Sequence, residues 1–293
     1  MPNSSSDELC VAVILSVHNG QAYLVPQLDS ILGQTWQDFT LYIRDDGSTD
    51  NSPAILQEYA RKDSRIRLIK TPGGNLGLTP SLKILLQAVR AQIIFFADQD
   101  DHWLPHKIQT MISSVPKSLN TEPWVAFSDL EVTDSQLNTV YPSFWSLAKI
   151  NPEKTSFRHI VRRNCVTGCA CAINRRMLQL VQEMPDQALH DWWLASLASL
   201  QGRLIPVRAP LVRYRQHDNN AIGAQQGGLG RARTLLNKPG LRKSYCRQLE
   251  SSLDHLLELA RIEPIKRNLF RSWLIKIEIC KRKCLKKVAG SFL

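Results

Sequence analysis

The stretch Ile93-Ile94-Phe95-Phe96-Ala97-Asp98-Gln99-Asp100-Asp101 decides the fold class of this chain. Its five apolar residues predict a buried β-strand, and three carboxylates follow where that strand leaves the core. Such a cluster is costly to bury without a partner. A divalent cation is one such partner, and Mg²⁺ or Mn²⁺ is the usual choice where a diphosphate must also be held. The alternative is a solvated acidic turn that caps a helix.

Strand and helix patterns alternate through the first hundred residues. This order predicts right-handed βαβ units and a mostly parallel sheet flanked by helices, which is an α/β fold. Ligands of such sheets bind beyond the carboxyl ends of the strands, and three polar clusters fall there, at 16–20, 45–50 and 98–101. The predicted strands are 9–17, 39–43, 66–69 and 93–97, and the predicted helices are 22–32, 53–60 and 81–89.

Two common nucleotide-binding patterns are missing from the sequence. No GxGxxG follows the first predicted strand, and the chain has no GxxxxGK[ST]. A dinucleotide-binding fingerprint and a P-loop are therefore not predicted.

The positive charge of the chain is concentrated near its C-terminus. The 293 residues carry a formal charge of +11, and the segment from Gly228 onward holds 16 Lys and Arg against 5 Asp and Glu. The first 227 residues are therefore neutral. A neutral main domain argues against a nucleic-acid groove, so we expect no nucleic-acid partner.

The N-terminus and the cysteines favour a cytoplasmic protein. Residues 1–8 are polar and do not resemble a signal peptide, and no apolar run reaches the roughly 18–20 residues of a membrane span. The seven cysteines form no CxxC pair, as expected of reduced thiols. Cys165, Cys169 and Cys171 form the one tight group, and buried thiols are favoured over a zinc site because no fourth ligand is evident.

Two short motifs have both a functional and a structural interpretation. In the segment 45–50, an Asp at a strand end can accept a hydrogen bond from a base imide, while Gly47 permits the turn and Ser48 or Thr49 can cap the next helix. A plain turn with a cap is the alternative. The segment Asn75-Leu76-Gly77 either presents backbone N–H groups to a phosphate or only turns the chain.

The chain resembles the family 2 glycosyltransferases, which have the nucleotide-diphospho-sugar transferase fold GT-A. The resemblance covers about residues 11 to 220, and His18 departs from it, since the family usually has Tyr there. Pieces at 164–169, 190–193 and 214–220 are similar to the bacterial rhamnosyltransferase-like branch, which builds O-antigen, capsule or cell-wall polysaccharide. The other matching pieces are Ser16-Val17-His18-Asn19-Gly20, Gln34-Thr35-Trp36, the segment 44–50, Asn75-Leu76-Gly77 and Asp98-Gln99-Asp100-Asp101-His102-Trp103.

The resemblance implies roles for several residues. Ser16 and Asp46 would contact the nucleotide base, and Asp98 and Asp100 would form the DxD motif that holds the ribose and the metal-bound diphosphate. Asp191 matches the catalytic base, which takes the proton from the acceptor hydroxyl in an inverting transfer; a helix N-cap is its structural alternative.

The remaining candidates are weaker and rest on chemistry as well as resemblance. The imidazole of His217 is a third candidate metal ligand, and Arg215 offers a planar fork suited to phosphate; a solvated basic rim is the alternative for both. Trp192 and Trp193, which follow Asp191 directly, are predicted either to stack on a sugar or to lie in the core. Further donor contacts are predicted at Asn19, Asp45, Asn75, Lys83 and Gln99, and acceptor contacts at Asp101, Asp129, Trp192 and Trp193.

The sequence predicts a catalytic domain followed by a basic extension. The GT-A catalytic domain is expected at 1–225, with nucleotide-sugar binding at about 9–105 and the acceptor half at about 106–225, and a helical extension is expected at 226–293. Residues 265–288 predict a basic amphipathic helix suited to an anionic membrane surface. Packing of that helix on the catalytic domain is the alternative.

The leading hypothesis is a metal-dependent inverting glycosyltransferase that uses Mg²⁺ or Mn²⁺. We expect dTDP-L-rhamnose as donor and a glycan or lipid-linked acceptor, at the inner face of the cytoplasmic membrane. A UDP- or GDP-hexose donor is the alternative, because the base-contacting residue types do not separate uracil from thymine. A nucleotidyltransferase is disfavoured because 16–20 has one glycine and no basic residue. A non-catalytic sugar-nucleotide-binding module is disfavoured by the intact Asp98, Asp100 and Asp191.

Overall fold

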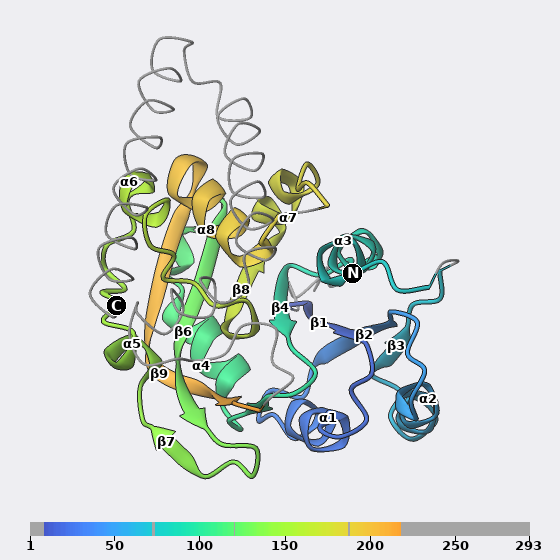
Figure 1. Cartoon of the computed structure of the whole chain (residues 1–293). Coiled ribbons are helices and arrows are strands. Elements are labelled where there is room, and N and C mark those ends of the chain that lie inside the picture. The colour runs from blue at the N-terminus through green and yellow to red at the C-terminus, as the bar shows by residue number, and fades with distance from the viewer. Residues whose placement is uncertain (1–8, 72–73, 120, 187, 218–293) are drawn as a thin grey trace, which may run out of the picture. The chain divides into compact units, whose positions relative to one another are not determined.

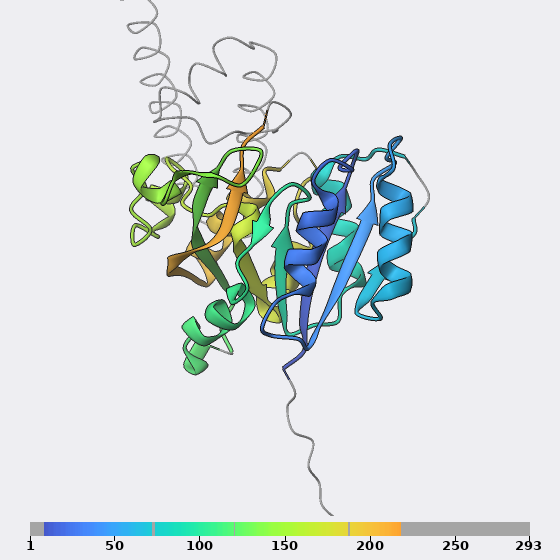
Figure 2. The same ribbon diagram turned by 90° about the horizontal axis from the view of Figure 1, so that it is seen from below.

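Four parallel strands form the N-terminal half of the sheet, in the spatial order β3-β2-β1-β4. Figures 1 and 2 show α1 and α2 on one face of these strands and α3 on the other, as right-handed crossovers require when the strand order reverses after β3. The predicted alternation of strands and helices is confirmed. The elements are β1 (Val11–Val17), α1 (Leu24–Leu32), β2 (Phe39–Asp45), α2 (Ser52–Lys62), β3 (Ile66–Leu68), α3 (Leu78–Ala88) and β4 (Ile93–Ala97).

The second half of the chain extends the same sheet and makes it mixed. The full order is β3-β2-β1-β4-β8-β6-β9-β5, with β7 paired to β6. Strand β8 is antiparallel to β4 and to β6, whereas β6 and β9 are parallel. These elements are β5 (His102–Trp103), α4 (Lys107–Ser114), β6 (Trp124–Thr133), β7 (Thr139–Tyr141), α5 (Phe144–Leu147), α6 (Phe157–Ile160), β8 (Cys171–Asn174), α7 (Arg175–Val181), α8 (His190–Gln201) and β9 (Arg203–Arg215).

The core lies between the central strands and the helices that cover them. All five residues of β4 are buried, which accounts for its uninterrupted apolar sequence. Leu24, Leu28 and Ile31 are fully buried and form one face of α1 through spacings of four and three. Each fully buried side chain of this size contributes about 1.5–3 kcal/mol of transfer free energy.

The structure is a computed structural model that describes residues 9–71, 74–119, 121–186 and 188–217. These residues all fall within one compact unit, Met1–Ala224. The extension expected at 226–293, including the basic helix expected at 265–288, lies outside the described residues. None of the described helices is long and apolar enough to cross a lipid bilayer.

Candidate functional site

The three polar clusters that follow β1, β2 and β4 lie at one edge of the sheet. The side-chain amide of Gln99 joins two of them, because it accepts from the backbone N–H of His18 (2.8 Å) and donates to the His18 carbonyl (3.1 Å). Asn19 joins the third, since its amide oxygen accepts from the backbone N–H of Thr49 (2.8 Å). The predicted convergence of the strand ends is therefore present in the fold.

The carboxylate of Asp46 is buried, with 2% exposed, and is fully engaged by the chain. It accepts from the backbone N–H groups of Leu76 (2.9 Å) and Gly77 (2.8 Å), and it pairs with the buried guanidinium of Arg44. Burial raises the pKa of Asp46, but these hydrogen bonds outweigh burial and hold it below its usual value. The backbone N–H groups of Leu76 and Gly77, one interpretation of which was a phosphate site, therefore donate their hydrogen bonds to Asp46.

Gly47 allows the two loops to approach each other. Its φ of 76° lies in the left-handed region, and a Cβ there would be 2.8 Å from the backbone nitrogen of Asn75. Any other residue would meet both a strained backbone and a backbone clash. The sequence prediction of a turn at Gly47 is therefore confirmed.

Other predicted base-site residues surround this contact. One carboxylate oxygen of Asp45 accepts from the backbone N–H of Ser48 (3.3 Å), and its other oxygen is buried with no hydrogen-bond partner among the described residues. The side-chain amide of Asn75 lies 3.1 Å from the His18 imidazole. Ser16 is half-buried, one residue before the end of β1. A ligand at this edge would therefore find one acceptor oxygen already desolvated.

The acidic cluster after β4 forms a compact group of oxygen and sulfur atoms. Candidate ligand atoms of Asp98, Asp101 and Cys169 all lie within 4.8 Å of one another. Burial raises the pKa of Asp98 to about 7, and the charges of Asp100 and Asp191 act in the same direction. The carboxylate of Asp101 is 0% exposed, and one of its oxygens has no hydrogen-bond partner among the described residues.

The end of β9 closes this cluster from the other side. The backbone N–H of Arg215 donates to Asp101 (3.2 Å), and its guanidinium donates to the Asp100 carbonyl (2.8 Å). The imidazole Nε2 of His217 lies 3.0 Å from a carboxylate oxygen of Asp100 and the ring stacks on Tyr23. Arg215 is therefore a support of the acidic loop in this structure, and Asp100 and His217 are close enough to bind one cation together.

Sequence reasoning missed Lys107, which is fully buried beside the acidic cluster. Its ammonium donates to the Cys169 carbonyl (2.6 Å) and lies 3.4 Å from the centre of the Trp103 ring. Burial lowers the pKa of Lys107 to about 7, although the charges nearby, including those of Asp101 and Asp98, favour the charged form. One local feature indicates this burial: Lys107 lies four residues before the buried Met111, so the two side chains share one face of α4.

Asp191 lies at the start of α8, as predicted. One of its carboxylate oxygens accepts from the backbone N–H of Trp192 (2.7 Å), so it partly caps the helix. It is also near enough to Asp98 for its charge to raise the pKa of that group. Trp193 is 1% exposed and lies in the core, which corrects its expected contact with an acceptor, whereas Trp192 is half-buried.

Asp129 lies inside strand β6 and not at its end. Strand β6 continues to Thr133, and its register with β9 shifts on both sides of Asp129. The carboxylate accepts from the Ser143 hydroxyl (2.5 Å) and from the backbone N–H of Trp145 (2.9 Å). Asp129 therefore holds the start of α5. The β-bulge that makes Asp129 available for these hydrogen bonds cannot be seen in the hydrophobic periodicity of the sequence.

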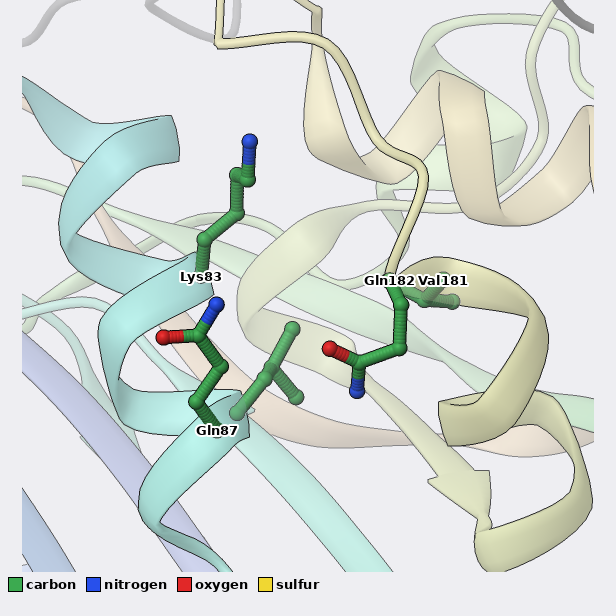
Figure 3. A pocket seen from close by; sticks show the side chains of 5 residues that line it. Lys83, Gln87, Val181 and Gln182 are labelled. Atoms are coloured by element: carbon green, nitrogen blue, oxygen red, sulfur yellow. The ribbon is translucent and has the colours of Figure 1, made fainter.

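Lys83 lies on α3 and has a carboxylate partner in the described structure. Its ammonium pairs with Asp186 (2.5 Å), and its side chain lines a shallow pocket between α3 and α7 (Figure 3). Gln87, Val181 and Gln182 line the same pocket. The structure thus pairs Lys83 with Asp186, between α7 and α8, and the donor contact expected of Lys83 remains a prediction.

Comparisons with known sequences agree on one family. The profile described as "Glycosyl transferase family 2" matches residues 12–178. The dTDP-rhamnosyl transferase RfbG of Shigella flexneri is 28% identical over 224 residues, which are 72% of this chain and 74% of that protein. The Escherichia coli protein WfgD, described as UDP-Glc:alpha-D-GlcNAc-diphosphoundecaprenol beta-1,3-glucosyltransferase, is 24% identical over 64% of this chain and 69% of its own length.

Comparisons with solved structures support the GT-A fold. S. aureus TarS in complex with UDP-GlcNAc is similar with a TM-score of 0.57 and 16% identity, over 72% of this chain and 60% of that one. The mannosyltransferase PcManGT from Pyrobaculum calidifontis, in complex with GDP-Man and Mn²⁺, has a TM-score of 0.51 and 14% identity, over 92% of this chain and 80% of that one. The chain thus spans about 60% of the TarS chain.

Proposed function

The chain belongs to glycosyl transferase family 2, and from that membership we propose that it transfers a sugar from a nucleotide-diphosphate donor to a glycan hydroxyl. One observation carries the proposal. Asp98 and Asp100 follow β4 and Asp191 starts α8, far apart in sequence, yet the charges of Asp100 and Asp191 both raise the pKa of Asp98. A donor-binding loop beside a separate carboxylate base is the arrangement that direct transfer requires.

Carboxylate and imidazole groups at the end of β4 fit a bound Mg²⁺ or Mn²⁺. Asp98, Asp100 and His217 would hold the cation, and one oxygen of the buried Asp101, which has no hydrogen-bond partner among the described residues, is a further acceptor beside them. Hard oxygen ligands with one imidazole suit these ions. When bound, the cation would neutralise negative charge on the diphosphate leaving group.

Asp191 is the proposed general base. Its position in the first turn of α8 places a carboxylate beside Asp98, where the anomeric carbon of a bound donor would lie. The carboxylate would take the proton of the acceptor hydroxyl as that oxygen attacks, and one displacement at the anomeric carbon inverts its configuration. Asp191 would act from the acceptor side, while the β4 loop holds the diphosphate on the other.

We propose dTDP-L-rhamnose as the donor, in the synthesis of bacterial surface polysaccharide. RfbG, which matches 72% of this chain, supports this choice. A UDP-hexose is the second candidate, because WfgD is named for UDP-Glc and matches 64% of the chain. The diphosphoundecaprenol in the name of WfgD favours a lipid-linked acceptor for this chain as well. Such an acceptor agrees with the proposal that the transfer takes place at the inner face of the cytoplasmic membrane.

A donor screen tests the proposal directly. Purified protein is melted with Mn²⁺ and dTDP-rhamnose, UDP-glucose, UDP-galactose, UDP-N-acetylglucosamine or GDP-mannose in turn. A donor present at 100 times its Kd should stabilise the fold by about 2.7 kcal/mol. The shift should disappear in Asp100→Asn and persist in Asp38→Asn, whose side chain is exposed. Absence of a shift with every donor in the folded protein would contradict the proposal.

The role of Asp191 is tested separately. Asp191→Asn keeps the shape of the side chain, so donor binding should be unchanged while turnover falls by about 10²–10⁴-fold. Transfer is measured at saturating donor and acceptor. Turnover within tenfold of the unmodified protein would remove Asp191 as the base.

A further inference from the structure

A buried hydrogen bond holds the segment that enters α8 to helix α3. The hydroxyl of Thr79, in the first turn of α3, donates to the backbone carbonyl of Ala188 (2.8 Å). Thr79 is 8% exposed and Ala188 is 4% exposed, so both groups are largely withdrawn from water and the bond is costly to leave unmade. The two residues lie 109 positions apart, so the bond joins segments that the sequence keeps far from each other.

Ala188 lies just before the helix that carries the proposed base. Leu189 is the N-cap of α8, and its carbonyl accepts a hydrogen bond from the backbone N–H of Trp193 (2.9 Å). The carbonyl of Ala188 therefore lies outside the helix, where it accepts from Thr79. Because Asp191 is the second residue of α8, the bond from Thr79 helps to fix where Asp191 lies.

Other contacts of the first turn of α3 hold it to the end of β2. The backbone N–H of Gly77, just before α3, donates to the Asp46 carboxylate (2.8 Å), and the fully buried Ser81 hydroxyl accepts from the Arg44 guanidinium (2.6 Å). The start of α3 therefore contacts the predicted nucleotide edge through Gly77 and Ser81, and it contacts the start of α8 through Thr79.

A second contact lies on the same face of α3. Lys83 follows Thr79 by four residues, so both side chains project from one side of the helix. The ammonium of Lys83 pairs with Asp186 (2.5 Å), where α3 lies beside the end of α7 (Figure 3). The two side chains are 27% and 67% exposed, and an ion pair that is open to water adds little stability. Thr79 is therefore the main link between α3 and the segment that enters α8.

We propose that Thr79 is a positioning residue, which sets the place of Asp191 relative to a donor nucleotide bound beside the loop 75–77. The inference rests on the function proposed above and names a further residue of its site. One turn of α3 contacts both the nucleotide edge and the start of α8, so a nucleotide that orders the loop also orders the carboxylate that receives the acceptor proton. A misplacement of about 1 Å at such a group can lower the rate by about 10²-fold.

Kinetics of Thr79 variants test the proposal. Transfer is measured from dTDP-rhamnose and UDP-glucose, with GlcNAc linked to an isoprenoid diphosphate as acceptor. Thr79→Val removes the hydroxyl and keeps the shape of the side chain, so kcat should fall at least about tenfold while the donor Kd from calorimetry stays within about twofold. Thr79→Ser keeps a hydroxyl and should restore kcat to within about threefold of the unmodified protein.

Thr133→Val is the matched control. Thr133 is fully buried on β6, and its hydroxyl has no hydrogen-bond partner among the described residues, so its removal should leave kcat unchanged. Two results would overturn the inference: a kcat of Thr79→Val equal to that of Thr133→Val, or a loss of donor affinity as large as the loss of kcat.

Hydrogen exchange tests the same link without relying on transfer. Backbone amides of 188–193 are followed in the full chain, alone and with Mn²⁺ and dTDP or UDP. They should exchange about tenfold faster in Thr79→Val than in the unmodified protein. Nucleotide should slow this exchange in the unmodified protein and in Thr79→Ser, but not in Thr79→Val. Equal exchange in Thr79→Val and the unmodified protein would overturn the inference.

These measurements also separate the inference from the function on which it rests. If the unmodified protein transferred no sugar, the proposed function would fail, while hydrogen exchange would still decide whether Thr79 holds the start of α8. If Thr79→Val does not fold, Thr79→Cys replaces it, because a thiol is a weaker donor of similar size. In that variant kcat should fall about threefold and the same amides should exchange faster; no change in either quantity would overturn the inference.

Discussion

Asp46 shows that a residue matched to a ligand-binding motif can also hold the fold together. Its carboxylate joins the end of β2 to the two backbone N–H groups that precede α3, and it neutralises a buried Arg44. The contact with the nucleotide base that the family resemblance implies remains a prediction. Asp45, which keeps a desolvated oxygen without a partner among the described residues, is the neighbouring group best placed to share that task.

Replacing Asp46 by Asn should lower the free energy of unfolding by about 3–5 kcal/mol, because a buried guanidinium loses its counter-charge. Urea unfolding at pH 7 measures this loss. The matched change Asp38→Asn, at an exposed position, should cost less than about 0.5 kcal/mol.

The lowered pKa of Asp46 also sets the pH range of this stabilisation. A carboxyl whose pKa is lower in the folded state adds stability above the unfolded value of 3.8 and loses it as the pH falls through the folded value. The difference between Asp46→Asn and the unmodified protein should therefore be constant near neutral pH and shrink below pH 3.8. A difference that grows on acidification would contradict the assignment.

Asp98 should make cation binding depend on pH. Its pKa of about 7 is above the ordinary 3.8, so the cation-free protein gains stability from the bound proton at low pH and loses that gain as the pH rises through about 7. A cation requires the ionised carboxylate. Affinity for Mn²⁺ should therefore rise up to about tenfold per pH unit between about pH 5 and 7 and then level off. Titration by electron paramagnetic resonance checks this, and an affinity independent of pH over that range would contradict it.

Residues were predictable where local pattern fixes their surroundings. Asp98 follows an uninterrupted apolar run and Asp191 opens a helix, so both positions could be inferred from neighbours in the sequence. Lys107 and Asp129 could not, because their partners Cys169 and Trp145 lie 62 and 16 residues away in the sequence. The spacing of Lys107 to Met111 indicates which face of the helix it lies on, but the distant partner that makes burial of its charge tolerable leaves no local pattern.

At the scale of elements, the start of α8 depends on its packing against the 168–170 turn. His190 stacks on Phe96, with ring centres 5.9 Å apart, and its Nε2 would lie 2.2 Å from a Cβ at Gly168. The missing side chain at Gly168 therefore sets how deeply the first turn of α8 can sit. Asp191 is the next residue, so its position follows from the same contact.

Gly168→Ala should displace His190 and cost about 1–3 kcal/mol of stability through overpacking. Turnover should fall while donor affinity changes little, because Asp191 moves and the β4 loop does not. Guanidinium unfolding, thermal shift with donor and a transfer assay measure the three quantities. Gly74→Ala is the control, since a Cβ there meets nothing within 4 Å, and unchanged turnover in Gly168→Ala would contradict the coupling.

The second half of the sheet marks the limit of element prediction. Strands β1 to β4 follow from period and turn residues, because the pairs β1–β2 and β2–β3 are each joined by one helix and β4 is a continuous apolar run. Strand β9 contains Pro206 and Pro210, which ordinarily argue against a strand. Shifts of register against β6 around Asp129 accompany these prolines, and only the pairing itself reveals them.

At the scale of the whole molecule, the first 227 residues are neutral and the rest of the sequence is basic, which predicts that donor binding and attraction to an anionic surface can be separated. A chain that ends at Ala224 contains the whole described fold and lacks the 16 basic residues from Gly228 onward. It should keep its donor-induced thermal shift. Binding to phosphatidylglycerol vesicles should fall at least tenfold, since each basic residue near such a surface adds about 1 kcal/mol. Co-sedimentation at two salt concentrations measures this, with phosphatidylcholine vesicles as control, and equal binding by both chains would contradict it.

Because β9 closes the acidic loop, the order of synthesis determines when that loop can adopt its final structure. Asp100 and Asp101 leave the ribosome more than a hundred residues before Arg215 and His217, the groups that hold them. At about 5–20 residues per second, the four parallel strands can fold roughly 6–24 seconds before the loop has its supports. The nascent chain should therefore form the four parallel strands early and complete the acidic loop only after β9 and His217 have been synthesised.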